Sequence, residues 1–377
     1  MATSTKTASA PNGRMRLQLF WLKIHRWIGL ALLIVFTVLA LTGSLLVWPD
    51  HFDRWVNPER YPTSAAITFA PPTTLIRSAQ TALPAGDQVS ALRFANGITA
   101  VRAVGQVNGP APMDLGPSSR AMVWLDPATG SILATAEGAG GFQWLLRAVH
   151  GHLLSSSWGR ELVALAGLIL LTSACTGLWL WWPGTRHLGR ALKWRRQASI
   201  SMNLHRQGGA IVVLILVLEA FTGVYVSVPF LFAHQDVAPS GIAQPIERPA
   251  APRTMATPQQ DADAVLAAAQ ARLPDARPAA LSLPMQGSGE WVITFATATG
   301  ERSVRIADAT GEARVDAAET PNAAQRIQHV MEDVHFGNYG PLWQTVVFLS
   351  GVVLVLLSVT GLLLWLQGRA RRMRHAR

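Results

Sequence analysis

The sequence contains a single cysteine, Cys175, and little charge of either sign. One cysteine excludes a disulfide framework and any metal site built from several thiolates. Only 14% of the 377 residues are charged, against about 25% in soluble globular chains, whereas half of them are hydrophobic. An intrinsically disordered chain has the opposite composition, poor in apolar and rich in charged residues. The composition therefore excludes disorder and favours a chain embedded in a membrane.

Apolar runs long enough to cross a bilayer occur four times, since a spanning helix needs about 20 predominantly apolar residues. They cover roughly Ile28–Trp48, Leu162–Trp182, Ala210–Val228 and Val346–Leu366. The first run is too long for the apolar part of a signal peptide, and no small-residue cleavage site follows it. We therefore expect it to be retained as a transmembrane helix.

Positive charge is concentrated in three segments that contain no acid: residues 1–26, 184–206 and 367–377 hold 16 Lys and Arg between them. Short segments rich in Lys and Arg stay in the cytoplasm, so we expect both termini and the middle loop on that side of a bacterial inner membrane. The rest of the chain has 16 basic and 22 acidic residues. The net charge of +10 thus reflects topology and does not indicate nucleic-acid binding.

The predicted order along the chain alternates short cytoplasmic segments, spans and two long periplasmic segments. It comprises a tail (1–27), a span (28–48), a periplasmic segment (49–160), a span (162–182), a loop (183–206), a span (207–228), a periplasmic segment (229–345), a span (346–366) and a tail (367–377).

The two periplasmic segments resemble each other, as a search for internal repeats reveals. LIRSAQTALP (75–84) matches VLAAAQARLP (265–274), and each predicts a helix that stops at proline. Alternating strands follow in both, with the predicted hairpin turns Asp126–Gly130 and Asp308–Gly311. Each segment is therefore predicted to be a small α+β module.

The membrane parts repeat as well. His25 and His205 each begin the pattern His-Arg-x-x-Gly and each precede a Thr-Gly pair by 17 positions. His150 and His335 each follow valine, precede tryptophan by eight positions, and lead to a second Thr-Gly pair. We predict an α-helical membrane protein, with a bundle of four transmembrane helices formed by two pseudo-twofold repeats.

Four paired histidines point to a cofactor. A pseudo-twofold axis would bring His25 to His205 near the cytoplasmic face and His150 to His335 near the periplasmic face. Two facing imidazoles can occupy both axial positions of a haem iron, and helix bundles build such sites from facing side chains. We predict two haem b groups. Zinc is a weaker alternative, because it prefers four ligands and no acid or cysteine accompanies either pair.

Residues near the predicted ligands extend this interpretation. Gly29 and Gly209 lie four positions after the inner histidines, on the same helix face, and would let a flat macrocycle approach the backbone. Arg26 and Arg206 could pair with haem propionates. The Thr-Gly pairs are interpreted as points of close helix packing, with haem contact as an alternative.

The periplasmic ligands leave more alternatives open. His152 competes with His150, although its repeat counterpart is a glycine, and His329 is a weaker competitor of His335. Glycines and a serine run interrupt the chain after His150, so we expect this histidine to end a short helix lying over the bundle. Glu219 is the only acid well inside an apolar run. It could carry a proton or lie beside the periplasmic cofactor, or it could be a protonated acid bonded to a neighbouring helix.

These motifs resemble those of the PepSY-associated transmembrane family over nearly the whole chain. The resemblance rests on HRWIGLALLIVFTVLALTG (25–43), VHGHLLSSSWGRELVALAGLILLTSACTGLWLWWPG (149–184), LHRQGGAIVVLILVLEAFTG (204–223) and the two outer modules, which look like PepSY domains. The family includes inner-membrane di-haem reductases of periplasmic ferric siderophores. The resemblance implies the same activity here, with the four histidines as ligands. It also implies an unidentified electron donor, either a separate cytoplasmic protein, a small reductant or a quinol.

Two other functions stay open on sequence grounds. The outer modules could bind a peptide or another protein, with the helices as an anchor that needs no paired histidines and no redox activity. A haem-bearing protein could also serve an acceptor other than a siderophore, such as a sulfur or copper compound.

Overall fold

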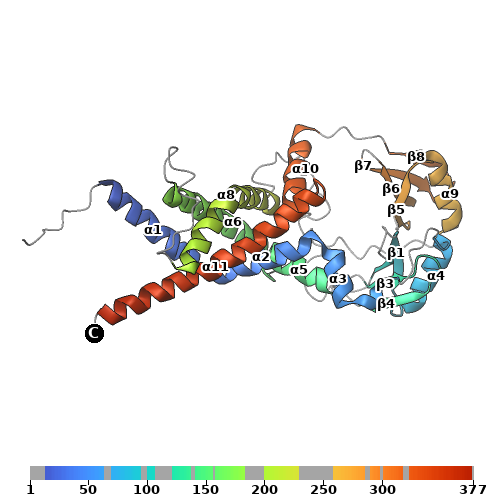
Figure 1. Cartoon of the computed structure of the whole chain (residues 1–377). Coiled ribbons are helices and arrows are strands. Elements are labelled where there is room, and N and C mark those ends of the chain that lie inside the picture. Colours follow the sequence, from blue (N-terminus) through green and yellow to red (C-terminus); the bar gives the residue numbers. More distant parts are fainter. Residues whose placement is uncertain are drawn as a thin grey trace, which may run out of the picture.

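A computed structural model describes residues 13–62, 69–94, 100–106, 121–136, 141–155, 158–182, 199–228, 258–284, 289–297, 300–316 and 322–375. The first 12 residues, most of the predicted loop 183–206 and the start of the segment 229–345 lie outside these ranges. The molecule is elongated, with a helical bundle at one end and a sheet at the other (Figure 1). We call these the tail end, where α1 and the chain's C-terminus lie, and the sheet end.

The bundle consists of α1 (Gly13–Ala31), α2 (Leu33–Val47), α6 (Gly159–Trp181), α8 (Ile200–Ser227) and α11 (Pro341–His375). Helix α6 packs against α8, and α11 packs against both α2 and α8. In the described part of the chain, α6, α8 and α11 are each long and apolar enough to cross a membrane. Helices α1 and α2 qualify as a fourth span only as a pair, because they are bent by 65°.

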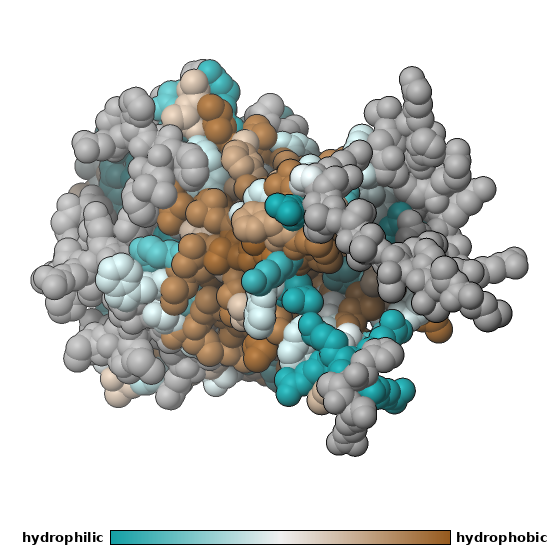
Figure 2. All heavy atoms as spheres, turned by 90° about the vertical axis from the view of Figure 1, so that its left-hand side faces the viewer, coloured by the Kyte–Doolittle hydropathy of each residue, from teal (hydrophilic) through white to brown (hydrophobic). Residues whose placement is uncertain are grey.

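The bend divides the predicted span 28–48 at Leu32, whose backbone (φ −103°, ψ 15°) leaves the helical conformation. No proline marks this position in the sequence, so the pattern of apolar residues does not reveal the break. The last predicted span, 346–366, lies inside the longer helix α11, which continues into the basic C-terminal segment. Large apolar side chains such as Ile34, Ile211 and Leu214 are exposed on the bundle, and Figure 2 shows hydrophobic residues across the middle of the tail end. This surface suits lipid.

The predicted outer modules share one sheet of eight antiparallel strands in the order β4-β3-β2-β1-β5-β6-β7-β8. From the first module come β1 (Gln88–Arg93), β2 (Val101–Gln106), β3 (Met122–Leu125) and β4 (Ile132–Ala136). From the second come β5 (Arg277–Ser282), β6 (Glu290–Thr297), β7 (Gly300–Ala307) and β8 (Ala313–Val315). Each segment thus contributes a helix and strands, as predicted, and the structure adds that the two sets of strands join. Strands β1 and β5 pair edge to edge, with Leu92 opposite Leu281, which removes two exposed strand edges.

One face of this sheet carries the core. Helices α4 (Pro72–Ala82) and α9 (Ala262–Arg272) contact each other and the strands. Their Leu75 and Val265 join Leu92, Ile293 and Phe295 in a single buried cluster. The predicted turns are confirmed: Gly130 and Gly311 have φ of +71° and +70° between paired strands. Because side chains alternate along a strand, the residues between the core positions lie on the opposite face.

Four short elements connect the sheet and the bundle. They are α3 (Pro49–Val56), the 3-10 turn η1 (Pro58–Arg60), α5 (Phe142–His152) and α10 (Ala323–Phe336). Helix α5 contacts α2, α3 and α6, and α10 contacts α8 and α11. Helices α5 and α10 carry the second pair of predicted histidines.

Candidate functional site: two histidine pairs

At the tail end, His25 of α1 and His205 of α8 face each other. Their ring centroids are 6.2 Å apart, with an angle of 72° between the ring planes. The two residues are 180 positions apart in the sequence, so the close approach results from helix packing and not from local structure.

At the sheet end, His150 of α5 and His335 of α10 form a second pair. Their ring centroids are also 6.2 Å apart, with an interplanar angle of 34°. The structure therefore brings His150 to His335, whereas His152 has no ring contact with another histidine among the described residues.

The short helices explain how these two histidines reach the bundle. Helix α5 ends just after His150, where Leu153 and Leu154 adopt left-handed conformations (φ 46° and 60°). Helix α10 ends just after His335 at Gly337, with φ of +81°. After each of these two helices the chain turns and begins a spanning helix. The prediction that His150 lies near the end of a short helix is confirmed.

A Thr-Gly pair on a neighbouring helix holds each histidine. The ring Nδ1 lies 3.1–3.3 Å from a threonine Oγ1 in all four cases. In three of them it also lies 3.0–3.1 Å from the backbone carbonyl three residues before that threonine. The contacts are His25 with Thr176, His150 with Thr42, His205 with Thr360 and His335 with Thr222. We call each such Thr-Gly pair, with its preceding turn, a cradle.

These hydrogen bonds settle the tautomer of the rings. Each threonine hydroxyl donates to a carbonyl of its own helix, as Thr42 does to Val38 at 2.7 Å and Thr360 to Leu356 at 2.7 Å. Its oxygen can then only accept, and the backbone carbonyl also accepts. The proton must lie on the histidine Nδ1. The lone pair of Nε2 is therefore left for a metal.

The glycine of each cradle makes room for the imidazole. A Cβ atom added to Gly43 would lie 2.7 Å from Cε1 of His150, and one added to Gly223 would lie 2.9 Å from Cε1 of His335. At Gly177 and Gly361 the corresponding distances to His25 and His205 are 3.1 and 3.4 Å. Any side chain here would push the ring, most strongly at the sheet-end pair.

Sequence reasoning missed this role of the Thr-Gly pairs, which it interpreted as sites of close helix packing. The available signal was the number of such pairs in the apolar runs: four Thr-Gly pairs lie there, one for each of the four paired histidines. His25 and His205 each precede the Thr-Gly pair of their own apolar run by 17 residues. This equal spacing suggests a relation within one run and does not reveal the contact with a Thr-Gly pair on another helix. Each histidine is in fact held by the Thr-Gly pair of a different helix in its own half of the chain.

Glu219 distinguishes one histidine from the other three. Its Oε2 lies 3.3 Å from Nδ1 of His335, and its side chain is 13% exposed. The other carboxylate oxygen, Oε1, is buried with no hydrogen-bond partner among the described residues. Glu219 therefore lies beside the second histidine pair, and its predicted role stays a prediction.

The other predicted residues surround the tail-end pair. Arg26 is exposed and Arg206 half-buried. A Cβ added to Gly29 would meet nothing within 4 Å, and one added to Gly209 would meet only Leu357 at 3.8 Å. Neither glycine is therefore in tight contact with a neighbouring helix.

The pair geometry suits one metal ion between two rings. With metal–nitrogen bonds of about 2.0 Å and each ring centre about 1.1 Å beyond its ligating nitrogen, two opposed imidazoles have centroids about 6.2 Å apart. The 6.2 Å separation in both pairs agrees with this value. The described residues include no group of three or more His, Cys, Asp or Glu that could hold a metal. Two ligands fit haem better than zinc.

The two pairs lie near opposite ends of the bundle. On α8, His205 belongs to the tail-end pair, and Thr222, which contacts His335, lies 17 residues further along. At 1.5 Å per residue this is about 25 Å, close to the thickness of about 30 Å of a bilayer's hydrocarbon core.

Comparison with known proteins gives one match. A family model described as the PepSY-associated TM region matches residues 22–368. No curated protein matches the chain.

Proposed function

The chain belongs to the family of the PepSY-associated TM region, and on this basis we propose that it is a transmembrane electron-transfer protein that reduces a periplasmic ferric siderophore. Two haem b groups would be held by His25 with His205 and by His150 with His335. When bound, each haem supplies one-electron chemistry at its iron. The observation that carries the proposal is the pair of facing imidazoles, found twice, with Nδ1 of each ring within hydrogen-bond distance of a threonine hydroxyl.

The chain's own residues provide orientation and charge. The four cradles fix each ring and its tautomer, so that Nε2 faces its partner. Arg26 and Arg206 lie on the helices of the tail-end pair, where they can bind propionates. Glu219 places negative charge against His335, which makes that imidazole a stronger donor.

The proposal includes the topology. Two pseudo-twofold halves, each with two spans, would place both termini in the cytoplasm and the sheet in the periplasm of a bacterium. Electrons from a separate protein, a small reductant or a quinol would enter at the tail end and leave at the sheet end. Reduction to ferrous iron weakens its binding by hard oxygen ligands and releases it.

An absorption spectrum of the detergent-purified protein, oxidised and dithionite-reduced, with haem counted as pyridine haemochromogen, tests this function. We expect about two b-type haems per chain and reoxidation of the reduced protein by a ferric siderophore. Haem-replete expression that gave colourless protein would contradict the proposal and favour a binding role for the sheet. Haem without reoxidation by any ferric siderophore would point to a different acceptor.

A further inference from the structure

Three arginines of the first half gather on the face of the sheet that α4 and α9 leave uncovered. Arg93 of β1 and Arg102 of β2 are directly opposite in the strand register, so they lie on the same face. Their neighbours Leu92 and Val101 belong to the core on the other face. Arg147 of α5 interacts electrostatically with both. Like charges at such positions destabilise a fold unless an anion compensates them.

The described part of the chain does not supply that compensation. None of the three arginines has a carboxylate within ion-pair distance there. Asp50 is the acid that attracts Arg147, and it already accepts a hydrogen bond of 2.8 Å from Gln143. Arg93 and Arg147 are exposed, so a solute can reach them.

The second half has no such cluster at the matching positions. Leu281 pairs with Leu92 at the centre of the sheet, so Ser282 stands where Arg93 stands, and its partner Val292 stands where Arg102 stands. Glu332 stands three residues before His335, where Arg147 stands three before His150. Arg305 of β7, opposite Val292 on the same face of the sheet, is compensated by Asp316 at 3.0 Å and by Glu290 at 3.6 Å. The uncompensated positive charge is therefore particular to the first half.

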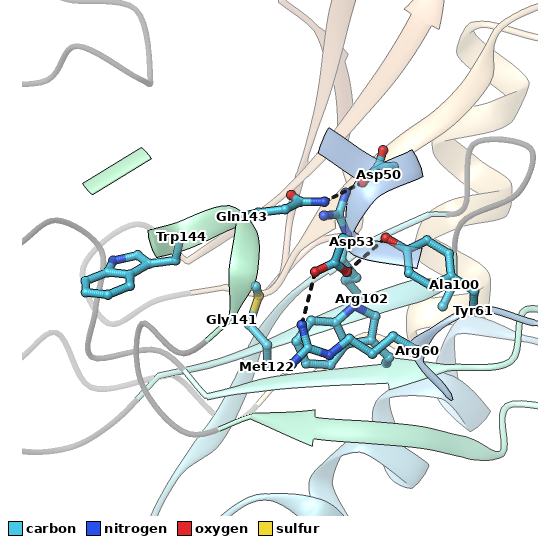
Figure 3. A pocket seen from close by; sticks show the side chains of 11 residues that line it. Asp50, Asp53, Arg60, Tyr61, Ala100, Arg102, Met122, Gly141, Gln143 and Trp144 are labelled. Atoms are coloured by element: carbon cyan, nitrogen blue, oxygen red, sulfur yellow. Dashed lines mark hydrogen bonds and ion pairs between the residues drawn. The ribbon is translucent and has the colours of Figure 1, made fainter. Parts of the chain in front are cut away.

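A small cleft of about 60 Å³ opens beside Arg102. Arg102 lines it together with Trp124, over whose ring Arg60 lies at 4.4 Å. Figure 3 shows the Asp53 carboxylate between Arg60 and Tyr61, which already bind it. The charge of Asp53 is thus compensated by a residue that lines the same cleft, whereas Arg102 can interact with a ligand.

Helix α5 links the arginines and the cleft to the sheet-end histidines. Arg147 precedes His150 by three residues on α5, a rise of about 4.5 Å. Gln143, which lines the cleft, precedes His150 by seven residues on the same helix, a rise of about 10 Å. Both therefore lie on the short helix that carries one of the sheet-end histidines.

We propose that Arg93, Arg102 and Arg147 form a binding site for the carboxylate groups of an anionic ferric chelate. Arginine suits this ligand because its guanidinium binds carboxylates in a two-pronged geometry. The identification of the anion as a ferric chelate rests on the proposed function. The anion site itself rests on the arginines.

The test uses the full chain in detergent and gallium(III) citrate, a redox-inert mimic of ferric citrate, in isothermal titration calorimetry. We expect binding that weakens as salt rises. Arg102→Gln should weaken it about tenfold, the value of one charge-assisted hydrogen bond. Arg147→Glu, which copies the second half, should weaken it further. Arg305→Gln is the control and should leave the binding of gallium citrate unchanged, because Arg305 is already paired with Asp316 and Glu290. None of these substitutions should change the binding of a neutral gallium trihydroxamate.

Three outcomes would overturn the site: no binding by the wild type, equal binding by Arg102→Gln and Arg147→Glu, or loss of the sheet-end haem in these variants. The last would mean that the arginines hold haem propionates. The proposed function can fail separately. A colourless protein that still bound gallium citrate through these arginines would keep the anion site and lose the electron-transfer role.

Discussion

The two halves of the chain, residues 13–182 and 199–375, build the same histidine cradles and surround them with different charges. In each half, one histidine comes from a long helix and one from a short helix, and both are held by Thr-Gly pairs. Leu39 in the first half stands where Glu219 stands in the second, relative to their Thr-Gly pairs. The parts that fix ring geometry are the same, whereas the parts that set local charge differ.

This difference separates two tasks. Holding two rings 6.2 Å apart requires matched contributions from both halves. Setting the charge beside the sheet-end histidines requires a residue from only one half, and so does attracting a ligand. In the functions proposed above, Glu219 from the second half and Arg147 from the first would both act at the sheet end of the bundle.

The largest effect should come from removing a whole pair of ligands, which both halves supply equally. The double variants His25→Ala/His205→Ala and His150→Ala/His335→Ala should each keep one of two haems, because in the proposed function each removes both histidines that would hold one haem. Haem counts and reduced spectra would measure this loss. His152→Ala is the control and should keep both haems. A double variant that kept two haems would remove that pair from the ligand set.

A smaller effect should follow from filling the cradles, and here the two ends of the bundle should differ. Gly43→Ala places a Cβ 2.7 Å from the His150 ring, whereas Gly361→Ala places one 3.4 Å from the His205 ring. Overpacking of this kind costs about 1–3 kcal/mol. Gly43→Ala should lower haem occupancy severalfold, and Gly361→Ala should nearly preserve it. Equal occupancy in the two variants would argue against the cradle as the support of the ring.

Glu219 offers a way to remove the charge difference without removing a ligand. Glu219→Gln keeps the size of the side chain and removes its negative charge from Nδ1 of His335. A less basic imidazole stabilises ferric iron less, so the sheet-end potential should rise, by about 59 mV for each tenfold change in equilibrium. Potentiometric titration of the absorption spectrum would measure it.

Glu161→Gln is the matched control for this experiment. Glu161 is an exposed acid in the first turn of α6, and no hydrogen bond joins it to either sheet-end histidine in the described residues. Its removal should leave both potentials nearly unchanged. A shift of the haem potential of the same size in both variants would mean that Glu219 acts only as one of many negative charges and not through its contact with His335.

Much of this architecture could be predicted from local sequence patterns. Apolar runs locate the spans, and the repeated histidines pair as the duplication implies. The break at Leu32 could not be predicted, because no proline or glycine pair marks it. The joining of β1 to β5 depends on the meeting of two strand edges far apart in sequence. Which histidine each Thr-Gly pair contacts depends on how the helices pack, and the spacing of residues along one helix does not determine that packing.

The smallest predicted effect concerns the turns of the sheet, where the halves again differ. Asp308 is 6% exposed and accepts hydrogen bonds from the backbone N–H groups of Gln259 and Gln260 and from the indole of Trp291. Asp126, at the matching turn, is half-buried and accepts only from its own turn. Burial alone would raise the pKa of Asp308, but these three donors outweigh it and lower the pKa.

A lowered pKa means that the folded state favours the carboxylate, so its stabilisation is present above the unfolded-state value of about 3.9. It is lost as the pH falls through the lower folded-state value. At pH 7, Asp308→Asn should cost about 1–3 kcal/mol, because the side chain presents one oxygen fewer to buried donors. Asp126→Asn should cost less. Thermal unfolding followed by tryptophan fluorescence would measure both, and the gap between wild type and Asp308→Asn should narrow in strong acid. Equal destabilisation by the two variants would show that the buried network in the second half contributes no more than the open turn in the first.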